Sequence, residues 1–382
     1  MTAADESLPV IITSENLWGK FANQYHAATS NIYTIKDYSS ASKIGAKQYL
    51  ALRALWNIAR PEDYVPEAWG INKIKMAEAR LNDVAHWKEF LKRMREDERH
   101  PPDELLPVPP LGGFSSVWYY QQLVMKSKLS IDDVEIVHGS PTRSKSIDAD
   151  ANVTEIFGEL TVSDCEAYGL EAGDEEASEL PDNTELDPDY KEPDLKNLFP
   201  PVSDENVVNT SLVGFASAVS YSVPGVQAHW SQERKGFKVG GKKKLYEART
   251  DGHMFITRSS RSEVIIEVKP KRRDDSATVR MQETAEIAAW IYAERDDKPK
   301  KESKYRRMLL AQDRDEIYLV MAEYNANYIE YLTDPESTSN CNPFLTMNEF
   351  GPWDISSAKN VAQIAVIILA VTLQLGNGEP LI

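Results

Sequence analysis

The chain has 382 residues, a formal net charge of −17 and a hydrophobic content of 42%. This length favours two domains, and the hydrophobic content is sufficient for a sizeable core. The two cysteines, Cys165 and Cys341, form no CxxC or Cys/His pattern, so no zinc site is predicted. Widely separated cysteines and an N-terminus without a signal-peptide pattern lead us to expect an intracellular protein, nuclear or cytoplasmic.

Charge is distributed unevenly along the chain. Residues 131–200 hold 20 acidic and 4 basic residues, whereas residues 221–314 hold 22 basic and 14 acidic ones. The acidic overall composition therefore does not exclude a nucleic-acid partner. We interpret 131–200 as an acidic, largely flexible linker. One alternative is that this segment folds over the basic region and competes with nucleic acid.

Residues 1–130 are expected to be mainly helical. A helical pattern covers 45–60 and stops at Pro61. The amphipathic stretch 71–97 predicts a helix that faces a core or, alternatively, binds a partner. A proline-rich break follows at 101–113, and 115–129 favours another helix.

Residues 201–382 predict an α/β domain with a mixed central sheet flanked by helices. The predicted helices cover about 203–220, 276–294 and 356–373. Strands are expected at 228–232, 237–239, 245–250, 316–324 and 328–332, and in a hairpin over 250–269. A basic link is expected at 298–307 and a long loop at 333–355. The apolar run 361–371 is too short to span a membrane, so a buried helix and no membrane partner are expected.

The hairpin TDGHMFITRSSRSEVIIEVK is the most informative stretch of this domain. If it folds about Ser260, Asp251 lies opposite Lys269. Side chains alternate along a strand, so Glu267 and Lys269 share a face and Val268 points to the other one. Asp251 can reach the same polar face, because cross-strand neighbours lie about 5 Å apart. We expect His253 to point away from this group.

These residues are suited to metal-dependent chemistry on phosphodiesters. Mg²⁺ prefers a few carboxylates plus waters, a need that Asp251 and Glu267 meet, and the backbone carbonyl of Val268 can add a ligand. Lys269 can orient a water or stabilise developing charge. On the following helix, Gln282 and Glu286 are four residues apart and share a face, so both can reach the site.

The order Asp251, then Glu267-Val268-Lys269 on successive strands, with a helix before and after, resembles the PD-(D/E)XK nuclease superfamily. The resemblance covers about 203–375. Gln282 on the trailing helix is similar to the QxxxY motif of the RecB-like subset, although Glu286 replaces the tyrosine and Thr250 stands where the name-giving proline would be. The general sequence character of this region also resembles the nuclease-like domains of uncharacterised fungal proteins.

The resemblance implies a restriction-endonuclease-like core and a magnesium- or manganese-dependent hydrolase acting on nucleic acid, with DNA favoured. Asp251 and Glu267 would then hold the metal with Val268, and Lys269 and Gln282 would assist catalysis. Two alternatives are a catalytically inactive module that binds nucleic acid or a protein, and an ordinary strand-face ion pair between Glu267 and Lys269. A homodimer is a further expectation for enzymes that cut both strands.

Other residues are candidates for supporting roles. Further acids are Glu233 and Glu205. Basic residues expected to contact nucleic acid are Lys242, Lys243, Lys244, Lys271, Arg272 and Arg273. The run 269–273 is also typical of a nuclear-import patch.

Overall fold

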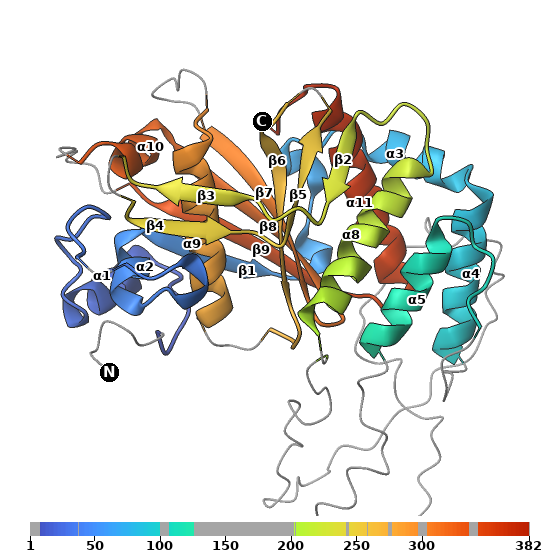
Figure 1. The fold of residues 1–382 in the computed structure, drawn as a ribbon, viewed down its shortest axis with the longest axis horizontal. Coiled ribbons are helices and arrows are strands. Elements are labelled where there is room, and N and C mark those ends of the chain that lie inside the picture. Colours follow the sequence, from blue (N-terminus) through green and yellow to red (C-terminus); the bar gives the residue numbers. More distant parts are fainter. Residues whose placement is uncertain are drawn as a thin grey trace, which may run out of the picture. The chain divides into compact units, whose positions relative to one another are not determined.

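A computed structural model describes residues 8–36, 38–99, 107–125, 202, 204–241, 244–257, 259–273, 277–296, 304–335 and 343–381. The described residues before 126 and those after 201 belong to one compact unit (Figure 1). The N-terminal residues thus share a core with the α/β region, where the sequence favoured a separate helical part. The predicted acidic linker, 131–200, lies outside the described residues.

A seven-stranded mixed sheet forms the centre of this unit, in agreement with the predicted α/β class. Its strands, in spatial order, are β1 (Ala54–Ala59), β9 (Leu345–Asp354), β8 (Glu316–Asn325), β7 (Lys304–Asp313), β6 (Ser262–Lys269), β5 (Gly252–Ile256) and β2 (Ala228–Ser231). The pairs β1–β9 and β6–β7 are parallel, and the other neighbours are antiparallel. A separate antiparallel pair consists of β3 (Gly236–Val239) and β4 (Tyr246–Arg249).

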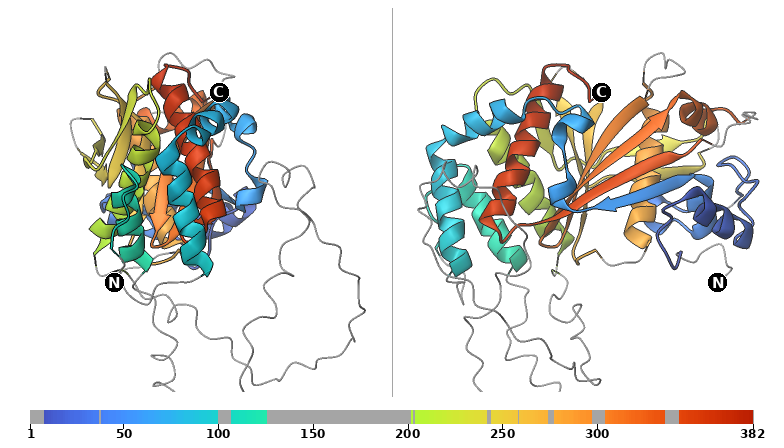
Figure 2. Two further views of the ribbon diagram at one scale, coloured as in Figure 1. Left: turned by 90° about the vertical axis from the view of Figure 1, so that its right-hand side faces the viewer. Right: turned by 180° about the vertical axis from the view of Figure 1, so that it is seen from behind.

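Helices cover both faces of the sheet, so each face has its own apolar core (Figure 2). One face packs against α3 (Ile74–Asn82), α4 (Ala85–Arg99), α5 (Phe114–Met125), α8 (Glu205–Tyr221) and α11 (Ala358–Gly376). The other packs against α1 (Glu15–Gln24), α2 (Ala46–Ala51), α9 (Thr278–Ala293), α10 (Ala326–Thr333) and the β3–β4 pair. Short 3₁₀ helices are η1 (Ala41–Lys43), η2 (Pro61–Asp63) and η3 (Pro66–Trp69).

The last helix, α11, is a core element. By length and composition alone it passes as a membrane span, but 72% of its most apolar window is buried inside the protein. Its burial on nearly all sides explains the apolar run that the sequence shows, and it agrees with the expected buried helix.

Five sequence-based element assignments were wrong. The helix predicted over 45–60 ends with α2, and β1 follows, because Arg53 adopts a positive φ of 51° and β1 pairs with the distant β9. The predicted strand 328–332 is helix α10, which Asn325 caps by accepting a hydrogen bond from Tyr328 N. The expected loop 333–355 contains β9, and the expected link 298–307 contains the start of β7. The helix expected over 71–97 is two helices, α3 and α4, that break at residues 83–84.

The predicted hairpin is present, but its register is offset by two residues. Gly252 pairs with Ile266 and a bulge follows between Met254 and Phe255, so Asp251 lies beside Glu267 and not opposite Lys269. Gly252 is also a point of close approach: a Cβ there would lie 2.5 Å from the Ser231 carbonyl oxygen of β2. Only a glycine fits this position without moving backbone.

Candidate metal centre

Asp251 occupies a rigid position immediately before β5. Its backbone carbonyl accepts a hydrogen bond from Asn209 Nδ2 of α8 at 2.9 Å. Its Oδ2 accepts the Val268 N–H at 3.2 Å, and its Oδ1 accepts Nη2 of Arg234 at 2.9 Å. The side chain of Asp251 is 8% exposed. Strand β6, helix α8 and the β2–β3 loop therefore together fix this carboxylate.

Three carboxylates converge here. Glu205, Asp251 and Glu267 each offer an oxygen, and these oxygens lie within 4.8 Å of one another. Glu205 comes from the first turn of α8, so the helix that caps one face of the sheet contributes the third acid. Glu233, the other acid considered from the sequence, is exposed and does not join this group. The predicted proximity of Asp251 and Glu267 is thus present, with Glu205 added.

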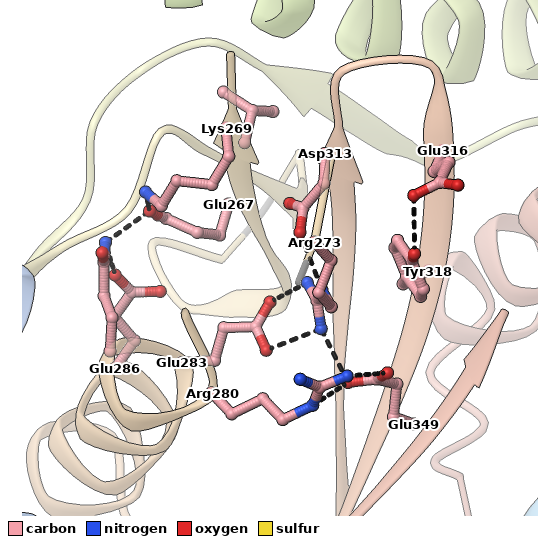
Figure 3. Close-up of polar contacts among 12 residues, drawn as sticks. Glu267, Lys269, Arg273, Arg280, Glu283, Glu286, Asp313, Glu316, Tyr318 and Glu349 are labelled. Carbon is pink, nitrogen blue, oxygen red and sulfur yellow. Dashed lines mark hydrogen bonds and ion pairs between the residues drawn. The ribbon is translucent and has the colours of Figure 1, made fainter. Parts of the chain in front are cut away.

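Glu267 is held on one side only. Its Oε1 accepts a hydrogen bond from Lys269 Nζ at 2.5 Å (Figure 3). The same oxygen accepts another from Gln282 Nε2. Its Oε2 is buried and has no hydrogen-bond partner among the described residues. Gln282 also donates to Glu286 Oε1 at 2.9 Å, so the trailing helix α9 faces the site as its sequence spacing indicated. Buried polar atoms normally have partners, so this oxygen is available to a ligand.

The electrostatics of the group favour an added cation. Burial opposes the charge of Lys269, but the Glu267 carboxylate outweighs this effect and raises the lysine pKa above its usual value. Burial, followed by the nearby Glu286, raises the pKa of Glu267. Burial also raises the pKa of Glu205, and it raises the pKa of Glu286 to about 8. The carboxylates therefore outnumber the cations in a water-poor site.

A divalent metal fits this donor set. Three carboxylate oxygens within 4.8 Å of one another match the hard oxygen ligands of Mg²⁺ and Mn²⁺. The Val268 N–H points at Asp251, and the carbonyl of a strand residue faces the same side as its N–H. The backbone of Val268 therefore faces Asp251, and its role as a metal ligand stays a prediction.

The basic residues predicted to contact nucleic acid have different surroundings. Lys242 and Lys243 lie outside the described residues. Lys271 is exposed, and Lys244 forms an exposed ion pair with Glu247 at 3.3 Å. Both lysines are accessible to a polyanion.

Arg272 and Arg273 are engaged inside the protein. Arg272 donates to both oxygens of Asp315, at 2.8 and 2.6 Å. The side chain of Arg273 is 2% exposed and contacts Glu283 at 2.5 Å, Asp313 at 2.7 Å and Glu349 at 2.8 Å (Figure 3). The prediction that Arg273 contacts nucleic acid is thus contradicted, because buried carboxylates neutralise it. The same ion pairs lower the number of free basic side chains in the run 269–273, which the sequence suggested as a nuclear-import patch.

The carboxylates around Arg273 form a network that positions α9. Arg280 of the same helix donates to both oxygens of Glu349 on β9, at 2.7 and 2.8 Å. Burial raises the pKa of Glu283 to about 7, whereas Arg273, against the effect of burial, holds the pKa of Glu349 low. The network joins α9 to β7 and β9, so it fixes the helix that presents Gln282. No sequence motif pointed to it.

Two further residues differ from expectation. His253 pairs with Ile265, and directly opposite residues share a sheet face, so His253 lies on the side of Glu267 and not away from it. It bonds Ser262 at 3.0 Å and does not enter the carboxylate group. Arg234, which contacts Asp251, was not found from the sequence, because a single arginine in a polar loop carries no pattern.

Searches of protein-family models and of curated proteins found no match to this chain. The candidate site is defined by its geometry.

Proposed function

We propose that this chain is a metal-dependent nuclease with its active site at Glu205, Asp251 and Glu267. The convergence of these three carboxylates beside Lys269, with one buried oxygen of Glu267 unpartnered, is the observation that carries the proposal. The hairpin between α8 and α9, with Gln282 facing inward, supports the resemblance to PD-(D/E)XK nucleases and their restriction-endonuclease-like core.

The reaction proposed is hydrolysis of a phosphodiester. The oxygen of water bonds to phosphorus, the bond to the leaving oxygen breaks, and one proton of the water ends on that oxygen while the hydroxyl group stays on phosphorus. A bound Mg²⁺ or Mn²⁺ supplies a hydroxide at neutral pH and neutralises phosphate charge. Lys269 is protonated near neutrality, because Glu267 raises its pKa, so it stabilises developing negative charge and does not act as a base. Gln282 fixes the orientation of Glu267 through its amide.

The proposed substrate is nucleic acid, with DNA favoured. The exposed side chains of Lys244, Lys271 and Arg234 provide positive charge on the surface of the unit. The homodimer and the nuclear or cytoplasmic location expected from the sequence belong to the same proposal.

Cleavage assays with purified protein test it. Single-stranded DNA, duplex DNA and RNA are each incubated with Mg²⁺ or Mn²⁺ and with wild type, Glu267→Gln and Lys269→Met. We expect cleavage by wild type and a loss of about 10²-fold or more in Lys269→Met. Lys238→Met, an exposed lysine on β3, is the matched control and should retain full activity.

Calorimetry separates the enzyme from a binding module. Wild type should bind Mn²⁺, and Glu267→Gln should lose that binding while circular dichroism stays unchanged. Salt-sensitive DNA binding without metal binding or cleavage would contradict the nuclease and favour the inactive module.

A further inference from the structure

Arg234 is the one cation in direct contact with Asp251 among the described residues. Its guanidinium reaches Asp251 Oδ1 at 2.9 Å, although the arginine side chain is 65% exposed and that of the aspartate 8%. The other aspartate oxygen accepts the Val268 N–H. Both oxygens of Asp251 are therefore occupied, one by a fixed backbone group and one by a side chain that can move.

Glu267 and Glu205, unlike Asp251, each offer an oxygen to which no group among the described residues donates a hydrogen bond. Lys269 and Gln282 hold Glu267 through Oε1 and leave Oε2 free. Lys269 lies 3.8 Å from Glu205 Oε1, an ion pair without hydrogen-bond geometry. A metal can therefore join Glu205 and Glu267 with Lys269 in place, whereas at Asp251 Oδ1 it competes with Arg234.

The backbone beside Arg234 is anchored, which limits where a released side chain can go. The Glu233 N–H bonds Ser231 Oγ at 3.0 Å. On the other side, Lys235 N donates to Thr250 Oγ1 at 3.3 Å and the Lys235 carbonyl accepts Thr250 N at 3.1 Å. With its neighbours held in this way, Arg234 can leave Asp251 by side-chain rotation alone.

Building on the proposed nuclease function, we propose that Arg234 is an exchangeable counter-cation: divalent metal displaces it from Asp251, and the freed guanidinium then binds a phosphate oxygen of the substrate. Its exposure makes the ion pair weak, so displacement is easy. A guanidinium binds phosphate well once its carboxylate partner is taken by metal. Arg234 would thus couple metal binding to substrate binding.

The first test measures metal affinity. Mn²⁺ is titrated by calorimetry into wild type, Arg234→Gln and Arg249→Gln. Arg249 is a matched control, because its side chain is 70% exposed and also contacts a carboxylate, Glu247, at 2.9 Å. Removal of a competing cation should tighten Mn²⁺ binding about two- to fivefold in Arg234→Gln. Arg249→Gln should bind Mn²⁺ as wild type does.

The second test measures nucleic-acid affinity in the Lys269→Met background, in which the strand stays intact. Fluorescence anisotropy with a labelled oligonucleotide compares affinity with and without Mn²⁺. The gain on adding Mn²⁺ should be about tenfold smaller when Arg234→Gln is added, because one charged hydrogen bond to phosphate is lost.

The outcomes separate this inference from the function on which it rests. If wild type binds no Mn²⁺, the nuclease proposal and this inference both fail. If Mn²⁺ binds wild type and Arg234→Gln equally, displacement is refuted while the metal site stands. If Mn²⁺ binding tightens but the gain in oligonucleotide affinity is unchanged, the phosphate contact is refuted.

Discussion

The two carboxylates that face Gln282 differ in what surrounds them. Glu267 has Lys269 as a partner, whereas Glu286 is fully buried and bonds only the Gln282 amide among the described residues. Burial raises the pKa of both acids, that of Glu286 to about 8.

A Glu286→Gln variant should change the pH dependence of stability. The pKa of Glu286 is raised from 4.5 to about 8, so between these values the folded protein holds a proton that the unfolded chain has released. The free energy of unfolding of wild type therefore falls with rising pH, by about 1.4 kcal/mol per unit for one full proton. Glu286→Gln keeps the amide contact and should reduce this slope.

Urea denaturation in EDTA at pH 5, 6, 7, 8 and 9 measures the effect. The variant should gain stability over wild type as pH rises and should differ least at pH 5. Glu330→Gln, an exposed glutamate on α10, is the control and should leave the slope unchanged. Parallel curves for wild type and Glu286→Gln would show that Glu286 is ionised in the fold.

At the level of elements, the close contact of β2 and β5 sets the position of Asp251. Gly252→Ala places a methyl carbon 2.5 Å from the Ser231 carbonyl and forces the strands apart. We expect a loss of about 1–3 kcal/mol in the free energy of unfolding. Mn²⁺ affinity should weaken as well.

Gly214→Ala in α8 is the control: the added methyl group meets nothing within 4 Å, so the free energy of unfolding should rise by about 0.5–1 kcal/mol. Equal behaviour of the two variants would contradict this account.

The buried ion network gives a second prediction at this scale. Arg273→Met leaves Glu283, Asp313 and Glu349 without their shared cation, so the free energy of unfolding should drop by about 3–5 kcal/mol. Chemical denaturation measures this loss. Arg249→Met removes an exposed pair and should change stability by less than about 0.5 kcal/mol. A small loss for Arg273→Met would mean that the network is not structural.

Local pattern predicted the elements whose contacts are close in sequence. The hairpin, α8, α9 and the β3–β4 pair follow from alternation, turn residues and helical spacing. The register of the hairpin could not be predicted, because alternation along the strands gives no sign of the bulge between Met254 and Phe255. The prediction that Asp251 and Glu267 lie close together does not depend on the register, since the expected and the observed pairing both place the two carboxylates on one face of the sheet.

At the scale of the whole molecule, the sequence-based predictions were wrong where segments far apart in the chain pair with each other. Strand β1 is short and half-exposed, and its partner β9 begins at residue 345. Pairing across such a distance leaves no local signal, so 45–60 appeared helical and β9 appeared to be a loop. Chain length favoured two domains, but β1 joins the N-terminal residues to the edge of the same sheet.

The acidic segment can be tested as a unit, since the compact unit formed by residues 1–128 and 199–382 excludes it. Helices α5 and α8 pack side by side, and a helix of 17 residues is about 25 Å long. A Gly/Ser linker of about 20 residues spans this distance. A chain with this linker in place of 129–198 should fold with stability within about 1 kcal/mol of wild type.

The same replacement should raise affinity for nucleic acid. The exchange removes most of the net charge of −17, and with it the repulsion of a polyanion. Anisotropy titrations at 50 and 500 mM salt should show the gain at low salt and its loss at high salt.

A variant with the sequence of the segment scrambled keeps the charge and is the matched control. If this variant binds nucleic acid as wild type does, charge alone opposes binding. If it binds like the linker variant, the order of residues matters, as a specific competing contact would require. Equal affinity of wild type and the linker variant at low salt would contradict any role of the acidic segment in binding.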